Sequence, residues 1–375
     1  MDAYADVSAF YDDFERWLAA GPPELVNAVA PETSTSGQMA GMRDLMKALY
    51  SEGWSRYGWP VEMGGLGGTI YHRAAMWEAL ARSGVSKMGA FEHLEVLGPT
   101  LLSLGPAEFV SAVFPRFLDG TESWAQGFSE PDAGSDLASI RTRATAMDGG
   151  YVVTGRKIWT SWAHYATWCL LLVRTGTAES RHRGVTAMAV NLKSPGVEVR
   201  PIAQADGNDE LAEVTFDDVF VPADRVIGAV DGGWAVAMDI LSHERGTFPW
   251  FRHCFLTSQL QEEIEFAAPH ADALLADAIL DLASSGAASA AGLQSHNEDS
   301  PLGPRAAFTK LLLCSAEQSL YDWTIATDGD IAADPADSSA METRQRYMFS
   351  RIVTIYGGSQ QMQLDTIAKR ILRLP

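Results

Sequence analysis

Two short segments carry hydroxyl and aromatic side chains where predicted strands end in loops. Residues 124–136 read WAQGFSEPDAGSD, and residues 155–161 read GRKIWTS. Pro, Asp, Gly and Ser are turn formers, so the first segment taken by itself is typical of a surface turn. Because both segments lie at strand ends, their side chains could instead meet in one binding site.

Trp159, Ser129 and Ser161 are the side chains in these segments that suit a flavin ring. A flavin requires a flat apolar neighbour and hydrogen-bond partners for its N5, its O4 and its pyrimidine edge. Trp159 could supply the face, and the two serines could supply hydroxyl groups. The chain has 11 tryptophans, so a place in the hydrophobic core is the alternative for Trp159.

The run His243-Glu244-Arg245 contains two side chains that could accept or donate a proton, followed by one cation. Histidine is the usual general base near neutral pH, and a glutamate serves when its site raises its pKa. The alternative for Glu244 is a solvated helix residue paired with a neighbouring charge. His243 would point about 100° away from it on a helix. No HExxH, GxSxG or P-loop pattern occurs, so no metal site is predicted.

The composition is that of a globular, acidic protein. The chain has 375 residues, of which 47% are hydrophobic, and its 48 acidic and 28 basic residues give a formal charge of −20. This charge repels nucleic acid and anionic lipid. No apolar run approaches the roughly 20 residues that span a bilayer, and the acidic start is unlike a signal peptide. We therefore predict a cytoplasmic protein with no nucleic-acid partner and no membrane span, whose three cysteines are buried and reduced.

The periodicity of apolar residues divides the chain into three segments that must position these side chains. Residues 1–117 repeat apolar residues three and four apart, as helices do. Residues 118–228 have a period of two and contain six or more short runs, which predicts an antiparallel barrel or sandwich. The helical period returns in residues 229–375, where residues 284–304, rich in Ser, Ala and Gly, are expected to form a loop.

Seven blocks along the chain resemble the acyl-CoA dehydrogenase family, in the family's order. They read YGWPVEMGGLGG, LGPTLLSLG, FSEPDAGSDLASIRTRA, GRKIWTS, AEVTFDDVFVP, LSHER and IYGGSQQMQLDTIAKRILRLP. The resemblance covers nearly the whole chain. It implies a mainly α fold with a central β-domain: an N-terminal helical domain over residues 1–117, a β-barrel middle domain over 118–228 and a C-terminal four-helix bundle over 229–375.

The same resemblance implies FAD as the cofactor and an acyl-CoA as the substrate. Ser135 would correspond to the serine that contacts the CoA arm, and Arg245 would support the pocket beside the base. Ser129 would lie near flavin N5, and Trp159 and Ser161 would lie at the isoalloxazine ring. Carried over by position, the residues that contact FAD would be Gln126, Phe128, Ser129, Trp159, Ser161, Ser359 and Gln361.

Family members place the catalytic glutamate at one of two positions that converge in space. One lies in a C-terminal Tyr-Glu-Gly motif, where this chain reads Tyr356-Gly357-Gly358. The other precedes an arginine on the first helix of the C-terminal domain, where this chain has Glu244. The resemblance thus implies that Glu244 removes the α-proton of an acyl-CoA thioester while a β-hydride passes to flavin N5, leaving a trans-2-enoyl-CoA. Gly246 and Pro249 predict an irregular helix beside it.

Several functions share these residues. A dehydrogenase would pass its electrons to an electron-transfer flavoprotein, and an acyl-CoA oxidase would pass them to O2. A non-catalytic subunit that contributes only FAD contacts would be expected to lack Glu244, and a nitroalkane-oxidase-like enzyme would use an aspartate.

The subunit composition is also open. Family homotetramers complete each FAD site with residues of a neighbouring subunit, and the runs that do so are not found after Glu244 or in residues 327–341. The chain is expected to form a homo-oligomer or to pair with a related dehydrogenase subunit as an α2β2 heterotetramer.

Overall fold

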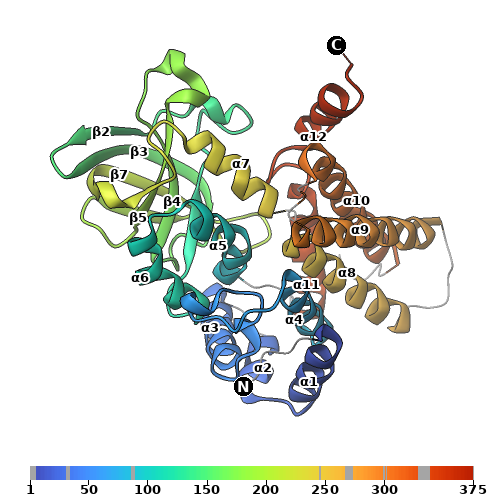
Figure 1. The fold of residues 1–375 in the computed structure, drawn as a ribbon. Helices are drawn as coiled ribbons and strands as arrows, with labels where there is room; N and C mark the ends of the chain where they lie inside the picture. The colour runs from blue at the N-terminus through green and yellow to red at the C-terminus, as the bar shows by residue number, and fades with distance from the viewer. Residues whose placement is uncertain are drawn as a thin grey trace.

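Helices, then strands, then helices again follow one another along the chain (Figure 1). The computed structural model describes residues 6–30, 34–85, 89–244, 246–266, 273–298, 300, 302–327 and 338–374. Arg245 and residues 328–337, which include most of the run expected to replace a family FAD loop, lie outside this description. The succession of element types is the one predicted from periodicity.

The first four N-terminal helices form the lower part of the molecule in Figure 1, and the next two lie higher, beside the strands. They pack through faces of apolar residues. In the first helix Phe10, Phe14 and Leu18, spaced four apart, are buried. Thr69 caps the fourth helix by accepting a hydrogen bond from the Tyr71 N–H. The helices are α1 (Val7–Ala19), α2 (Pro23–Val29), α3 (Thr35–Ser51), α4 (Ile70–Arg82), α5 (His93–Leu104) and α6 (Ala107–Leu118).

The strands form one eight-stranded sheet with the order β6-β7-β3-β2-β4-β5-β8, in which β1 pairs with β4. Most pairs are antiparallel, as predicted, but β1 and β2 pair with β4 in parallel. The short β1 pairs with β4 alone among the described strands. The strands are β1 (Trp124–Gly127), β2 (Arg143–Met147), β3 (Gly150–Ser161), β4 (Trp168–Arg174), β5 (Val185–Asn191), β6 (Val197–Pro201), β7 (Leu211–Pro222) and β8 (Val226–Ile227).

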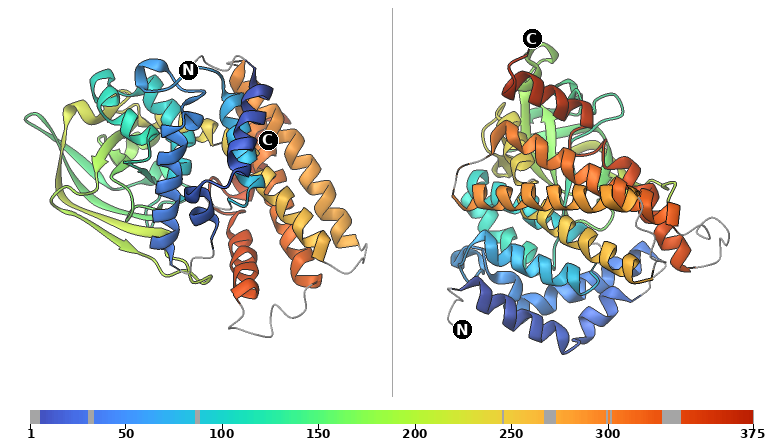
Figure 2. Two further views of the ribbon diagram at one scale, coloured as in Figure 1. Left: turned by 90° about the horizontal axis from the view of Figure 1, so that it is seen from below. Right: turned by 90° about the vertical axis from the view of Figure 1, so that its right-hand side faces the viewer.

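Helix α7 (Gly233–His243) leads from the sheet to the C-terminal helices and lies between them in Figure 1. Its first residue, Gly233, packs directly on β5, since a Cβ atom there would lie 2.5 Å from the carbonyl carbon of Thr186. The other helices are α8 (Thr247–Phe266), α9 (Ala273–Asn297), α10 (Ala306–Thr327), α11 (Ser338–Ile352) and α12 (Gln360–Thr366). Figure 2 shows α9 and α10 side by side along the outer face.

The expected loop over residues 284–304 is wrong in its first two-thirds, because α9 continues to Asn297. Small residues line the buried face of this part of the helix, among them Ser285, Gly286 and Ser289. Gly286 lets His253 of α8 approach so closely that a Cβ atom would lie 2.6 Å from its Nε2. Close helix packing therefore outweighs the weak helix propensity of Ser and Gly.

Helix α9 is also, among the described residues, long and apolar enough to cross a membrane. The test rests on length and composition alone, and 28% of the most apolar window of α9 is buried in the fold, where the helix packs against α8 and α10.

Candidate active site

Glu244 lies at the break between α7 and α8. It caps the C-terminal end of α7, where its backbone N–H donates to Ile240 O at 3.0 Å, and α8 starts at Thr247. The break falls where an irregular helix was predicted from Gly246 and Pro249. Pro249 itself lies in the first turn of α8. The side chain of Glu244 is half-buried, which partly withdraws its carboxylate from water.

Gln126 reaches from the sheet to this carboxylate. Its Nε2 donates a long hydrogen bond of 3.4 Å to Glu244 Oε1. Parallel pairing with β4 fixes β1, with Gln126 opposite Leu170. Gln126, which the family resemblance assigns to flavin binding, thus also contacts the candidate base. The β-region and the helical region therefore share one site.

Gly357 lies against the same carboxylate, although it is far from Glu244 in sequence. A Cβ atom placed on Gly357 would lie 3.6 Å from Glu244 Oε2. The fold therefore brings together the two positions at which the resemblance allows a base, and only one of them carries a carboxylate. The backbone of Gly357 has φ +60°, in the left-handed region that favours glycine.

Gln363 holds the turn that contains Gly357. Its side chain is buried, and its Nε2 donates to Gly357 O at 3.5 Å and to Gly358 O at 3.1 Å. No sequence pattern singles out this glutamine. In the sequence it is one polar residue among several in the run that forms α12. That run alone does not show that Gln363 faces inward.

The strand ends predicted to form a flavin site are adjacent in the structure. The Ile158 N–H donates to Ser129 O at 3.0 Å, which joins the segment after β1 to the end of β3. Phe128 is buried, and Ser129 and Ser161 are half-buried. Within the part of the chain that the structure describes, neither serine hydroxyl makes a hydrogen bond, so both are available to a ligand.

Trp159 has the backbone and the exposure of a ligand-binding residue and not of a core residue. Its side chain is 55% exposed, whereas Trp124 in the core is completely buried. Its φ of 61° is unusual for a bulky residue, and the register of β3 against β7 shifts between Lys157 and Thr160. Strained residues at such irregularities cluster at functional sites. The exposed indole beside two available hydroxyls fits the flat ring of a flavin.

A buried ion pair fixes these two segments to each other. Lys157 Nζ donates to Glu130 Oε1 at 2.8 Å and to Phe128 O at 3.0 Å, and both side chains are buried. Glu130 also accepts from the backbone N–H groups of Arg141 and Thr142. Burial lowers the pKa of Lys157 to about 8, against the effect of Glu130, so the ammonium form still predominates at neutral pH. The sequence analysis quoted both residues without assigning this role.

Three other predicted residues lie in the loop after β1 and at or near the start of α12. Ser135 is exposed in the loop after β1, and Ser359 caps α12 by accepting from the Met362 N–H. Gln361 is exposed on α12, and Arg245 lies outside the described residues. No hydrogen bond of the described chain joins Ser135, Ser359 or Gln361 to Glu244 or Trp159.

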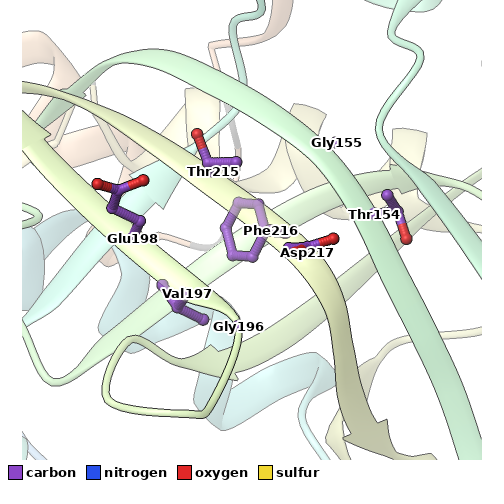
Figure 3. A pocket seen from close by; sticks show the side chains of 8 residues that line it. All are labelled: Thr154, Gly155, Gly196, Val197, Glu198, Thr215, Phe216 and Asp217. Carbon is purple, nitrogen blue, oxygen red and sulfur yellow. The ribbon is translucent and has the colours of Figure 1, made fainter.

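A cavity of about 520 Å³ opens elsewhere, over β3, β6 and β7 (Figure 3). None of the predicted site residues lines it. Two of its side chains, Glu198 and Asp217, are carboxylates, which would repel the phosphates of a nucleotide-bearing ligand. The site described above is therefore the better candidate.

Comparison with known proteins identifies three consecutive matches. The N-terminal domain of acyl-CoA dehydrogenase matches residues 23–121, the middle domain matches 125–219, and the C-terminal domain matches 231–372.

Relatives and solved structures agree with these matches. The acyl-CoA dehydrogenase IpdE1 of Mycobacterium tuberculosis is 35% identical over 99% of this chain and 98% of its own length. A structure titled Tcur3481-Tcur3483 steroid ACAD has a TM-score of 0.84 at 25% identity, covering 100% of this chain and 98% of that chain. The ChsE4-ChsE5 complex from Mycobacterium tuberculosis has a TM-score of 0.78 at 25% identity, with coverages of 100% and 99%. The chain therefore belongs to the acyl-CoA dehydrogenase family of oxidoreductases.

Proposed function

We propose that this enzyme converts an acyl-CoA thioester to a trans-2-enoyl-CoA, with Glu244 as the base and FAD as the cofactor. The observation that carries the proposal is the meeting of Glu244, Gln126 and Gly357 at the junction of the sheet and the helical region. Bound FAD would supply the hydride acceptor, its N5. The chain's own residues must bind the thioester, orient it and take its α-proton.

Glu244 is suited to the proton step by its position. A carboxylate in water has a pKa of about 4.3 and cannot deprotonate a thioester α-carbon unaided. Partial burial at the end of α7 weakens hydration of the charged form and so strengthens the base. Gln126 donates to one carboxylate oxygen, which leaves Oε2 on the side of Gly357. Such positioned acid–base groups contribute about 10²- to 10⁴-fold to rate.

The strand ends supply the cofactor contacts. Trp159 would cover the flavin ring, and Ser129 and Ser161 would donate hydrogen bonds to it. The ion pair of Lys157 and Glu130 keeps these segments in register. Ser359 and Gln361 would reach the adenosine or pyrophosphate part, and Ser135 and Arg245 would contact the substrate side.

The substrate is proposed to be a bulky acyl-CoA of the steroid type, and the enzyme to act with a related subunit. Both parts rest on the titles of the similar structures, which name a steroid enzyme and two-component complexes. Gly357 supports the substrate proposal, because the lack of a side chain leaves room beside the base. We place the enzyme in the cytoplasm, with an electron-transfer flavoprotein as its electron acceptor.

Anaerobic titration of the purified flavoprotein tests the reaction. Straight-chain, branched and steroid acyl-CoAs are added in turn while the flavin absorbance is followed. We expect bleaching by at least one of them, with the steroid thioesters fastest. If none bleaches the flavin, the proposed reaction is wrong. Reoxidation of the reduced enzyme in air distinguishes a dehydrogenase, which reacts slowly with O2, from an oxidase.

Replacement of Glu244 tests the assignment of the base. Glu244→Gln keeps the size and the hydrogen-bonding capacity of the side chain but cannot accept the proton. We expect acyl-CoA binding to persist and flavin reduction to slow by about 10²-fold or more. Glu298→Gln, at an exposed position after α9, is the matched control. Reduction of Glu244→Gln at the wild-type rate would assign the base elsewhere.

A further inference from the structure

Helix α10 brings a lysine to the candidate base. The point that a Cβ atom of Gly357 would occupy lies 3.6 Å from Glu244 Oε2 and 3.7 Å from Lys310 Nζ. The ammonium group and the carboxylate thus flank the same small space. In an enzyme that carried a side chain at position 357, this space would be filled.

Two contacts hold Lys310 in this place. Its Nζ lies 3.9 Å from the centre of the Tyr356 ring, a cation–π distance. One helical turn further along α10, Cys314 Sγ donates to Val353 O at 3.0 Å, which fastens the segment before Gly357 to the helix. Lys310 itself is half-buried, and its helix neighbours Thr309 and Leu313 are buried.

Other charged groups on α7, α8 and α10 form pairs of their own. Deeper in the bundle, Arg252 of α8 forms a buried pair with Glu317 of α10. On α7, Asp239 lies 3.5 Å from His243 and accepts from Thr100 of α5.

Further titratable groups among the described residues lie on α9, on α10 and in the turn before Gly357. The His243 ring lies 5.5 Å from that of His296 on α9, whose pKa is lowered by burial. Burial raises the pKa of Tyr356, and the negative charges of Glu317 and, less strongly, Glu92 add to this rise. Burial also raises the pKa of Cys314, and Lys310 opposes that shift. The cation that α10 offers to Glu244 is therefore Lys310.

We propose that Lys310 is a positioning residue for the base, whose ammonium group keeps the Glu244 carboxylate ionised and directs its Oε2 towards the space beside Gly357. A nearby cation favours the charged form of a carboxylate. The base would then be ready for proton abstraction at a lower pH than its partly buried setting alone would allow. The role of Lys310 rests on the proposed function, since it acts through Glu244.

The pH dependence of flavin reduction tests this role. The rate of anaerobic reduction at saturating acyl-CoA is measured from pH 5 to 9 for wild type, Lys310→Met and Lys310→Arg. We expect the midpoint of the acid limb to rise by about 1 pH unit in Lys310→Met, because the carboxylate loses a neighbouring cation. Lys310→Arg should restore most of the wild-type profile. Lys193→Met, at an exposed position after β5, controls for loss of a positive charge. Superimposable profiles for wild type and Lys310→Met would overturn the proposal.

A second measurement requires neither substrate nor flavin reduction. Melting temperatures are compared for wild type, Lys310→Met, Glu244→Gln and the double variant. If the two side chains interact, Lys310→Met should change the melting temperature by a different amount when Glu244 has already been replaced. Equal changes in both backgrounds would mean that Lys310 does not act on Glu244. A failure of every acyl-CoA to bleach the wild-type flavin would instead count against the proposed reaction, and this cycle would still be informative.

Discussion

At the scale of single residues, we propose that the pair Glu244 and Gly357 sets the chemistry of the site. The chain carries one carboxylate where two backbone positions converge. A Cβ atom placed on Gly357 would lie 3.6 Å from Glu244 Oε2, so the gap between residue 357 and the carboxylate is small. A fully extended glutamate side chain reaches about as far beyond its Cβ as this gap. A carboxylate attached to residue 357 would therefore be able to occupy the same neighbourhood as the present one.

This geometry predicts that the base can be moved. The variant Glu244→Gln/Gly357→Glu should recover about 10-fold or more of the flavin reduction lost in Glu244→Gln. Recovery should be incomplete, because φ +60° at position 357 costs a residue with a Cβ atom about 1–2 kcal/mol. Gly357→Glu in the wild-type background should be slow, since two carboxylates would then repel each other. A double variant no faster than Glu244→Gln would contradict the convergence.

Trp159 provides a second test at this scale. It is 55% exposed, so Trp159→Ala should leave the melting temperature of the apoprotein nearly unchanged while weakening FAD binding. Trp124 is completely buried, and Trp124→Ala should cost about 3–5 kcal/mol of folding stability. The measurements are thermal unfolding of the flavin-free protein and fluorescence titration with FAD. Equal destabilisation by the two substitutions would indicate that Trp159 is a core residue and not a ligand-binding one.

The sequence named candidate site residues but not their contacts. Glu244 and Trp159 stand in motifs that can be recognised along the chain. Gln126 and Lys310 act across elements that are distant in sequence, so their proximity to Glu244 depends on the tertiary fold. Gln363 was missed for the same reason, because a buried glutamine in a short helix has no periodic signature.

At the scale of elements, the ion pair of Lys157 and Glu130 joins β3 to the segment after β1. Burial alone would raise the pKa of Glu130, but the charge of Lys157 and the hydrogen bonds to the carboxylate outweigh burial and lower it. A carboxylate whose pKa is lower in the folded state stabilises the fold above its ordinary pKa of 4.5. That contribution is lost as the pH falls from this value through the pKa of the folded state.

Acid unfolding should reveal this contribution. The wild-type melting temperature should fall more steeply below pH 4.5 than that of Glu130→Gln/Lys157→Met, which has neither charge. At pH 7, Lys157→Met alone should cost about 3–5 kcal/mol, because it leaves a buried carboxylate without its partner. The double variant should lose less than the single one. Parallel acid profiles for wild type and the double variant would contradict the assignment.

Helix α9 shows where local patterns mislead. Residues 284–297 are rich in Ser, Ala and Gly, which resembles a loop when propensity alone is considered. In the fold the same residues let α9 lie close to α8, with Ser285 and Ser289 buried. By contrast, the short apolar runs of β4 and β5 were predicted as strands, and both strands are buried along almost their whole length.

At the scale of the whole molecule, α9 also presents an apolar outer face. Only 28% of its most apolar stretch is buried, and Ile279 and Leu280 are 47% and 65% exposed. Exposed apolar patches of this kind mark interaction surfaces. We expect the related dehydrogenase subunit proposed above to cover this face.

Leu280→Asp should therefore separate the subunits without unfolding the chain. Its side chain is exposed, so the isolated chain should keep its melting temperature, whereas Leu282→Asp, at a position that is 3% exposed, should unfold it. Val230→Asp is the matched control, because Val230 is 50% exposed and lies before α7, away from α9. Co-expression with a related subunit, followed by size-exclusion chromatography with light scattering, measures the assembly. We expect a heterotetramer for wild type and Val230→Asp and dissociated subunits for Leu280→Asp. Wild type purified alone as a fully flavinylated, active homotetramer would show that a second copy of this chain covers α9 instead.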